Sequence, residues 1–129
     1  MEVIAKTKFA RVSPRKLRYL RPVVINKEAE SAIEVLKNIP NSGAVIIRKL
    51  IKSALSNAGQ KKPEQKLWYV KNLLIDEGPR MKRMRSAPMG RAVVIQKKLS
   101  HLKVILEEIP ESQINKRNIY GTKGKSNRA

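Results

Sequence analysis

Two long β-forming stretches, separated by a short basic segment, constrain this chain more than any other feature of its sequence. They span residues 67–75 and 92–109, and apolar and charged residues alternate near the end of the second. The segment 78–91 between them contains two glycines, two prolines, five cations and no acid. Such a segment suits neither a helix nor a core. The sequence therefore predicts a long β-hairpin over about 67–106, with its tip at 80–91.

The predicted hairpin is too exposed to fold by itself. About seven residues of each arm would project from the rest of the protein, which is roughly 25 Å at about 3.3 Å per residue. An isolated two-stranded hairpin is at best marginally stable in water. We therefore expect this hairpin to lie against a partner.

A short strand is predicted at the start of the chain. Apolar and polar residues alternate over 3–10, which places Ala5 and Phe9 on one face and Lys6 and Lys8 on the other.

Three helices are predicted between this strand and the hairpin. The first begins at Ser13 and Pro14, an N-cap residue and a first-turn proline, and Pro22 ends or kinks it. The second covers 28–37, and the third begins at Asn41 and Ser42 and ends near Gly59, before a loop at 60–65. The second helix carries Ala29, Ala32, Ile33 and Leu36 on one side, and the third, expected at the centre of the core, carries Ala44, Ile47, Ile51, Ala54 and Ala58.

The length of 129 residues predicts a single domain. We place this domain at 1–109, including the hairpin. Residues 110–129 form a polar, basic tail that contains two glycines, and we expect it to be disordered or ordered only on its nucleic-acid partner.

Positive charge dominates the chain and is clustered. Lys and Arg number 29 against 10 Asp and Glu, a net charge of +19. Seven cations lie in 6–21, seven in 80–98 without an acid, and five in 116–128. Separate clusters of this kind favour binding to the phosphates of a large folded RNA. A DNA-binding nucleoid or regulatory protein is the alternative, and it predicts a preference for duplex DNA.

The sequence offers little for an enzyme. Cysteine is absent and His101 is the single histidine, which excludes thiolate nucleophiles, Cys-based metal sites and sites with two imidazoles. The adjacent acids Asp76-Glu77 and Glu107-Glu108 point to opposite faces of a strand and do not converge. We expect no catalytic residue, no metal and no cofactor. The longest apolar run, at 44–47, is far shorter than the roughly 18 residues of a membrane span, so no membrane partner is expected.

Several motifs occur in one order along the chain and carry a family resemblance. They are Ser13-Pro14-Arg15-Lys16-Leu17-Arg18, Lys27 with Ala32-Ile33-Glu34-Val35-Leu36, Ser53-Ala54-Leu55-Ser56-Asn57-Ala58, Glu77-Gly78-Pro79-Arg80-Met81-Lys82-Arg83, Gly90-Arg91-Ala92 and Ser100-His101. Over about 3–107 the sequence resembles the uL22 family of large-subunit ribosomal proteins, of the bacterial L22 type. The resemblance implies an α+β fold: a small three-stranded antiparallel sheet packed with three helices, with a long protruding β-hairpin and here a basic C-terminal tail.

The resemblance also implies a function without catalysis. Proteins of this family are structural constituents of the large ribosomal subunit. They bind 23S-type rRNA, aid subunit assembly, contact neighbouring ribosomal proteins, and line the nascent-peptide exit tunnel near the macrolide site with the hairpin tip. We therefore expect a cytoplasmic ribosomal protein, with an organellar ribosome as the second option, and no homo-oligomer.

Two sets of site residues follow from the charge clusters and the resemblance. The residues predicted to bind rRNA are Lys6, Lys8, Arg11, Arg15, Lys16, Arg18, Arg80, Lys82, Arg83, Arg85, Arg91, Lys97, Lys98 and His101. The residues predicted to line the tunnel and face the nascent peptide are Met84, Arg85, Ser86, Ala87, Pro88, Met89 and Gly90. The tip departs from the family pattern, because Ser86-Ala87-Pro88-Met89 stands where Pro-Arg-Ala-Lys is usual.

Overall fold

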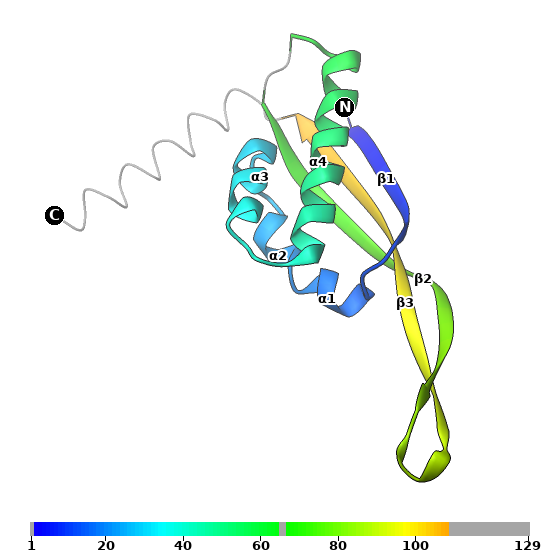
Figure 1. The fold of residues 1–129 in the computed structure, drawn as a ribbon. Helices are drawn as coiled ribbons and strands as arrows, with labels where there is room; N and C mark the ends of the chain where they lie inside the picture. Colours follow the sequence, from blue (N-terminus) through cyan, green and yellow to red (C-terminus); the bar gives the residue numbers. More distant parts are fainter. Residues whose placement is uncertain (1, 65–66, 109–129) are drawn as a thin grey trace, which may run out of the picture.

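A three-stranded antiparallel sheet forms the frame of the protein. The computed structural model describes residues 2–64 and 67–108. The strands are β1 (Glu2–Ala10), β2 (Trp68–Ser86) and β3 (Ala92–Glu108), and β3 lies between the other two. The helices lie on one face of the sheet, and the hairpin of β2 and β3 extends far beyond them (Figure 1). This architecture confirms the predicted α+β fold. The predicted tail at 110–129 lies outside the described residues.

The first predicted helix consists of two short helices, α1 (Pro14–Arg18) and α2 (Arg21–Val24). A break in the first predicted helix is confirmed, but its predicted place at Pro22 is wrong, because α1 already ends at Arg18. Pro22 occupies the first turn of α2, where its missing N–H costs no helical hydrogen bond. The second predicted helix is α3 (Ala29–Lys37), with Glu28 at its N-cap.

The long helix α4 (Ser42–Lys61) packs across the sheet. The Asn41 side chain caps its start by accepting a hydrogen bond from the Gly43 N–H at 3.0 Å. All five apolar residues that were predicted to face the core are buried. The predicted end near Gly59 is wrong, because α4 continues to Lys61. Gly59 is exposed and lies within the helix, where glycine is tolerated at a cost of about 1 kcal/mol relative to alanine.

The prediction that Phe9 lies on the same face of the strand as Ala5 is also wrong. Ala5 is buried, but Phe9 is 59% exposed, and Ala10 takes the buried position instead. The pairing of β1 with β3 shifts register between Thr7 and Ala10, and Phe9 has a left-handed φ of 59°. A bulge of this kind breaks the alternation on which the prediction rested.

The hairpin leaves the body at Gly78. A Cβ at this position would lie 3.0 Å from the backbone carbonyl of Leu99, so glycine permits the close approach of the two strands. The register between β2 and β3 shifts between Glu77 and Arg80, which absorbs Pro79 without ending the strand.

The tip is narrower than the predicted 80–91. Seven further cross-strand pairs follow the register shift, from Arg80↔Lys98 to Ser86↔Ala92, so the turn occupies only 87–91. These seven pairs match the predicted length of each arm. No side chain from Asp76 to Lys98 is buried. The hairpin is therefore held by backbone pairing without a core of its own.

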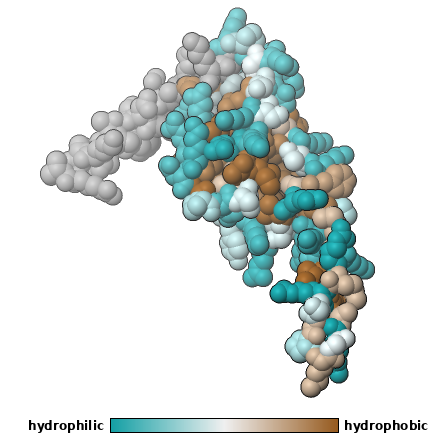
Figure 2. All heavy atoms as spheres, in the orientation of Figure 1, coloured by the Kyte–Doolittle hydropathy of each residue, from teal (hydrophilic) through white to brown (hydrophobic). Residues whose placement is uncertain are grey.

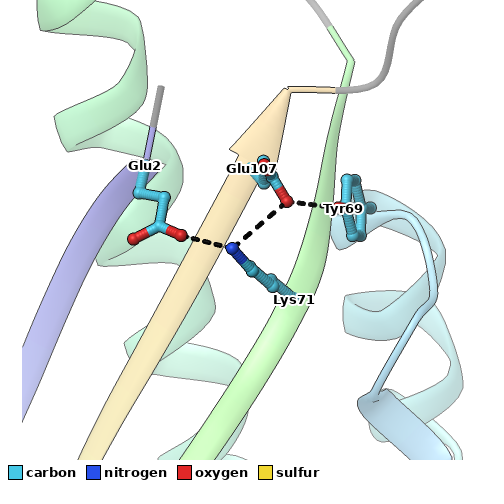
Figure 3. A network of polar contacts seen from close by, with 4 residues as sticks. All are labelled: Glu2, Tyr69, Lys71 and Glu107. Atoms are coloured by element: carbon cyan, nitrogen blue, oxygen red, sulfur yellow. Dashed lines mark hydrogen bonds and ion pairs between the residues drawn. The ribbon is translucent and has the colours of Figure 1, made fainter.

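A charged network joins the three strands at the end of the sheet remote from the hairpin (Figure 3). Lys71 of β2 forms ion pairs with Glu2 of β1 and, at 3.7 Å, with Glu107 of β3. The Tyr69 hydroxyl donates a hydrogen bond to Glu107. This bond, together with the Lys71 charge, lowers the pKa of Glu107, and the hydrogen bond to Glu2 is the main cause that raises the pKa of Lys71.

Ser100 ties the root of the hairpin to the start of α1. Its side chain is fully buried, and its hydroxyl donates a hydrogen bond to the Val12 carbonyl oxygen. We expect Ser100→Ala to lower the free energy of unfolding by about 1–3 kcal/mol, because the carbonyl loses its partner in a buried place. Urea unfolding of the full chain measures this change.

Ser86→Ala is the matched control for this variant. Ser86 is exposed at the far end of β2, so the same change there should alter the free energy of unfolding by less than about 0.5 kcal/mol. Equal effects of the two substitutions would contradict a buried hydrogen bond at Ser100.

The network in Figure 3 predicts a shift in one titration. Tyr69→Phe removes the hydroxyl that donates to Glu107, so the pKa of Glu107 should rise toward its ordinary value. Because the folded pKa is lowered, the contribution of Glu107 to stability is present above the ordinary carboxyl range and is lost as pH falls through the folded pKa. An NMR titration of the Glu107 carboxyl carbon measures the shift, with exposed Glu34 as reference. An unchanged Glu107 midpoint would contradict this role of Tyr69.

Candidate nucleic-acid interface

A cationic groove lies at the root of the hairpin, where the segment after β1, α1 and the start of α4 meet both arms. It has a volume of about 610 Å³. Five cations line it, no acid does, and its other lining residues are polar or apolar. The cations are Arg11, Lys16, Arg83, Lys97 and Lys98. The fold thus brings together cations of two charge clusters, and these cations are more than 60 residues apart in sequence. The arrangement suits a phosphate backbone.

The walls of this groove are fixed by contacts of β3 with the end of β1 and with the segment that follows β1. The Ser100 hydroxyl holds the carbonyl of Val12, which is itself a lining residue. One residue along β3, His101 accepts a hydrogen bond at Nδ1 from the Phe9 N–H at 3.2 Å. The His101 ring meets the Phe9 ring edge-on, with centroids 5.1 Å apart. The exposed bulge at Phe9 therefore serves to hold the connection to α1 in place.

The register of the hairpin distributes its cations over both faces. Partners in the ladder share a face, and neighbours along a strand alternate. One face carries Arg80, Lys82 and Lys98, and the other carries Arg83, Arg85 and Lys97. Arg80 and Lys98 lie directly opposite each other, and two like charges in this position destabilise an isolated strand pair. Both faces can therefore receive anions.

Apolar side chains replace cations toward the end of the hairpin. Met84 and Val94 are cross-strand partners and are 68% and 52% exposed. The hairpin end in Figure 2 is largely in light brown tones, whereas the part nearer the body is mostly teal. Contacts at the tip would thus depend less on charge than contacts at the root.

The turn that closes the hairpin has an unusual backbone. Ala87 donates a hydrogen bond to the Arg91 carbonyl oxygen at 2.7 Å, and Pro88–Gly90 form a short 3-10 turn. Met89 and Gly90 have φ values of 64° and 69°. Left-handed φ is rare for a residue with a side chain, and here it leaves Met89 95% exposed. The turn projects the thioether away from the protein.

The predicted rRNA-binding residues do not form one site. Five line the groove, and Arg80, Lys82, Arg85 and Arg91 lie on the hairpin outside it. Lys6, Lys8 and His101 line a smaller hollow over β1 and β3, which Asp76 of β2 also lines. Arg15 and Arg18 are on α1, and Arg18 donates a hydrogen bond to the Ile75 carbonyl oxygen at 3.2 Å. The predicted tunnel-lining residues all lie at the hairpin end, within 84–90.

Several lining residues were not among the predicted site residues. Met81, Gln96 and Ser42 line the groove, and Lys103 lines the hollow beside His101. Alternation along β3 could have indicated Lys103, since it lies two residues from His101 on the same face. Ser42 gave no signal, because only the tertiary fold brings the start of α4 to the hairpin.

Several acidic residues of the described chain are paired with cations, and Glu2 and Glu107 meet at Lys71. Glu107 joins Lys71 on the open face of the sheet, while Glu108 forms an ion pair with Lys62 at the end of α4. Glu77 lies 3.7 Å from Arg80. Within residues 2–64 and 67–108, no group of three His, Cys, Asp or Glu residues could hold a metal ion.

No helix in the described part of the chain is both long and apolar enough to cross a lipid bilayer.

Comparison with known proteins identifies the family. Residues 5–107 match the family described as ribosomal protein L22p/L17e. The chain is 42% identical over 106 residues to large ribosomal subunit protein uL22 of Treponema denticola, covering 81% of this chain and 90% of that protein. It is 44% identical over 109 residues to uL22 of Desulfotalea psychrophila, covering 84% and 99%. The chain therefore belongs to the ribosomal protein L22p/L17e family and is a structural, non-enzymatic, cytoplasmic component of the large ribosomal subunit.

Proposed function

We propose that this protein binds large-subunit rRNA through the groove at the hairpin root and so aids the assembly of the subunit. The observation that carries the proposal is the groove itself, which gathers five cations from two distant clusters and no acid. Phosphates that enter it would release condensed counterions, which makes binding strong and sensitive to salt.

The exposed hairpin supports the same proposal. Cations on both of its faces suit insertion between RNA segments rather than attachment to one flat surface. A folded RNA would supply the external support that a two-stranded ribbon without a core requires. Neighbouring ribosomal proteins would contact the parts of the body that the RNA leaves free.

We further propose that the hairpin tip lines the nascent-peptide tunnel near the macrolide site. The support is chemical: residues 84–90 combine apolar side chains with one cation, Arg85. An exposed thioether at Met89 offers a flexible apolar contact that adapts to different peptides.

Removing one groove charge should weaken binding in a salt-dependent way. Lys97→Gln deletes a cation that no described acid neutralises, so the slope of log K against log salt for large-subunit rRNA should fall by about 0.7–0.9. Filter binding at several salt concentrations measures the slope. Melting of the free protein should be unaffected, because Lys97 is exposed.

Lys37→Gln is the matched control for the groove. Lys37 lies in the last turn of α3, a helix that also exposes Glu30 and Glu34, and we expect no change of slope for this variant. Equal slopes for both variants would contradict a phosphate site in the groove. Equal or tighter binding of the wild-type protein to duplex DNA at matched salt would favour the DNA-binding alternative.

A shortened hairpin separates the tip from the groove. Arg83 and Ile95 are cross-strand partners, so an Asn-Gly turn between them replaces 84–94 and retains the groove cations. We expect subunits with this variant to assemble but to change macrolide sensitivity or nascent-chain stalling. Assembly is read by sedimentation and the drug response by growth. Unaltered drug response and stalling in assembled ribosomes would reject the tunnel role.

A further inference from the structure

A second hollow, outside the groove, follows the outer edge of β2 beneath α1 and α2. Its volume is about 500 Å³. It differs from the groove because it has apolar walls and contains an acid. The lining residues used below are Arg18, Arg21, Ile25, Leu74 and Asp76. Of these, only Arg18 was a predicted rRNA-binding residue.

Two guanidinium groups are fixed in this hollow by the edge of the sheet. Arg21 donates through Nε to the Leu73 carbonyl oxygen at 3.0 Å and through Nη2 to the Asn72 Oδ1 at 3.0 Å. Arg18 donates through Nη2 to the Ile75 carbonyl oxygen at 3.2 Å. These bonds occupy backbone acceptors of an edge strand and hold planar cations in place. Arginine planes held in this way are platforms on which unpaired RNA bases stack.

Asp76 distinguishes this hollow from a phosphate site. Its side chain is exposed, and it also lines the smaller hollow that contains Lys6, Lys8 and Lys103. Within the described part of the chain it nevertheless forms no ion pair. A carboxylate repels phosphate, but it accepts hydrogen bonds from the N–H groups of a base. Ile25 and Leu74 add apolar surface that would contact the ring.

We propose that the hollow binds an unpaired guanine of the RNA, with its ring against the arginines and its Watson–Crick edge on Asp76. Guanine is the base whose edge presents two adjacent donors, N1–H and N2–H, to the two oxygens of one carboxylate. The proposal rests on the proposed RNA-binding function and adds a base-specific contact to it. The two sites are close neighbours, because α1 carries both Lys16 of the groove and Arg18 of the hollow.

Removing the charge of Asp76 tests the proposal, because phosphate-only binding and a guanine contact predict opposite changes in the affinity for RNA. Asp76→Asn raises the net charge by one, so binding through phosphates alone predicts equal or tighter association. A guanine contact predicts a roughly 5- to 150-fold loss of affinity for full-length large-subunit rRNA, as expected when one bidentate base contact is removed. Filter binding with the full chain at one salt concentration measures the change.

Glu34→Gln is the matched control, because it removes one exposed acid from α3, outside the hollow. It should leave the affinity unchanged or slightly higher. If Asp76→Asn behaves like Glu34→Gln, the guanine site is overturned. If the wild-type protein does not bind rRNA at all, the proposed function fails, and the guanine site fails with it.

Binding of single nucleotides distinguishes failure of the guanine site from failure of rRNA binding. Guanosine monophosphate, inosine monophosphate and inorganic phosphate are titrated into the ¹⁵N-labelled full chain. We expect guanosine monophosphate to shift the amides of Asn26, Leu74 and Asp76 more than inosine monophosphate, which lacks the N2 donor, and Asp76→Asn to abolish this preference. Equal shifts with inosine monophosphate or phosphate would overturn the guanine site while leaving rRNA binding through the groove intact.

Discussion

The hairpin buries no side chain between Asp76 and Lys98, and this constraint governs how the rest of the structure is arranged. Seven ladder pairs hold the ribbon together, and several of its exposed side chains repel one another. A two-stranded ribbon of this kind is marginal in water. The body supports it at one end, and the proposed RNA partner would support it along its length.

The body meets this constraint through β3. This strand is the centre of the sheet and also one arm of the hairpin, so the core that packs against Leu102, Val104 and Leu106 fixes the direction of the whole ribbon. Ser100 and Gly78 lie where the body ends and the ribbon begins. One supplies a buried hydrogen bond and the other permits close contact of the strands. The groove forms at this junction because both arms approach α1 only there.

Local patterns predicted most of the body correctly and little of the interface. Apolar residues recur in α4 at steps of three and four because one side of the helix is buried, so the core positions from Ala44 to Ala58 were assigned correctly. The helix end was not, because α4 runs past Gly59 to Lys61. The orientation of Phe9 was predicted wrongly because its left-handed backbone is held by a hydrogen bond to His101, which is more than 90 residues away. The charge clusters indicated RNA, but the groove depends on Ser42 and the hollow on contacts between Arg18 and Ile75. Local sequence patterns do not predict such long-range contacts.

Several of the few acids lie far from the groove. Glu2, Glu107 and Glu108 neutralise Lys71 and Lys62 at the end of the sheet remote from the hairpin. Internal neutralisation thus occurs where no cationic groove has formed, and the groove keeps its cations free of acids. Two acids lie nearer the hairpin. Glu77 forms an ion pair with Arg80, and Asp76 lines both the hollow of Arg18 and Arg21 and the smaller hollow of Lys6, Lys8 and Lys103. If phosphates were the only ligands of Arg18 and Arg21, the Asp76 carboxylate would weaken their binding, whereas the guanine proposed above would donate hydrogen bonds to it.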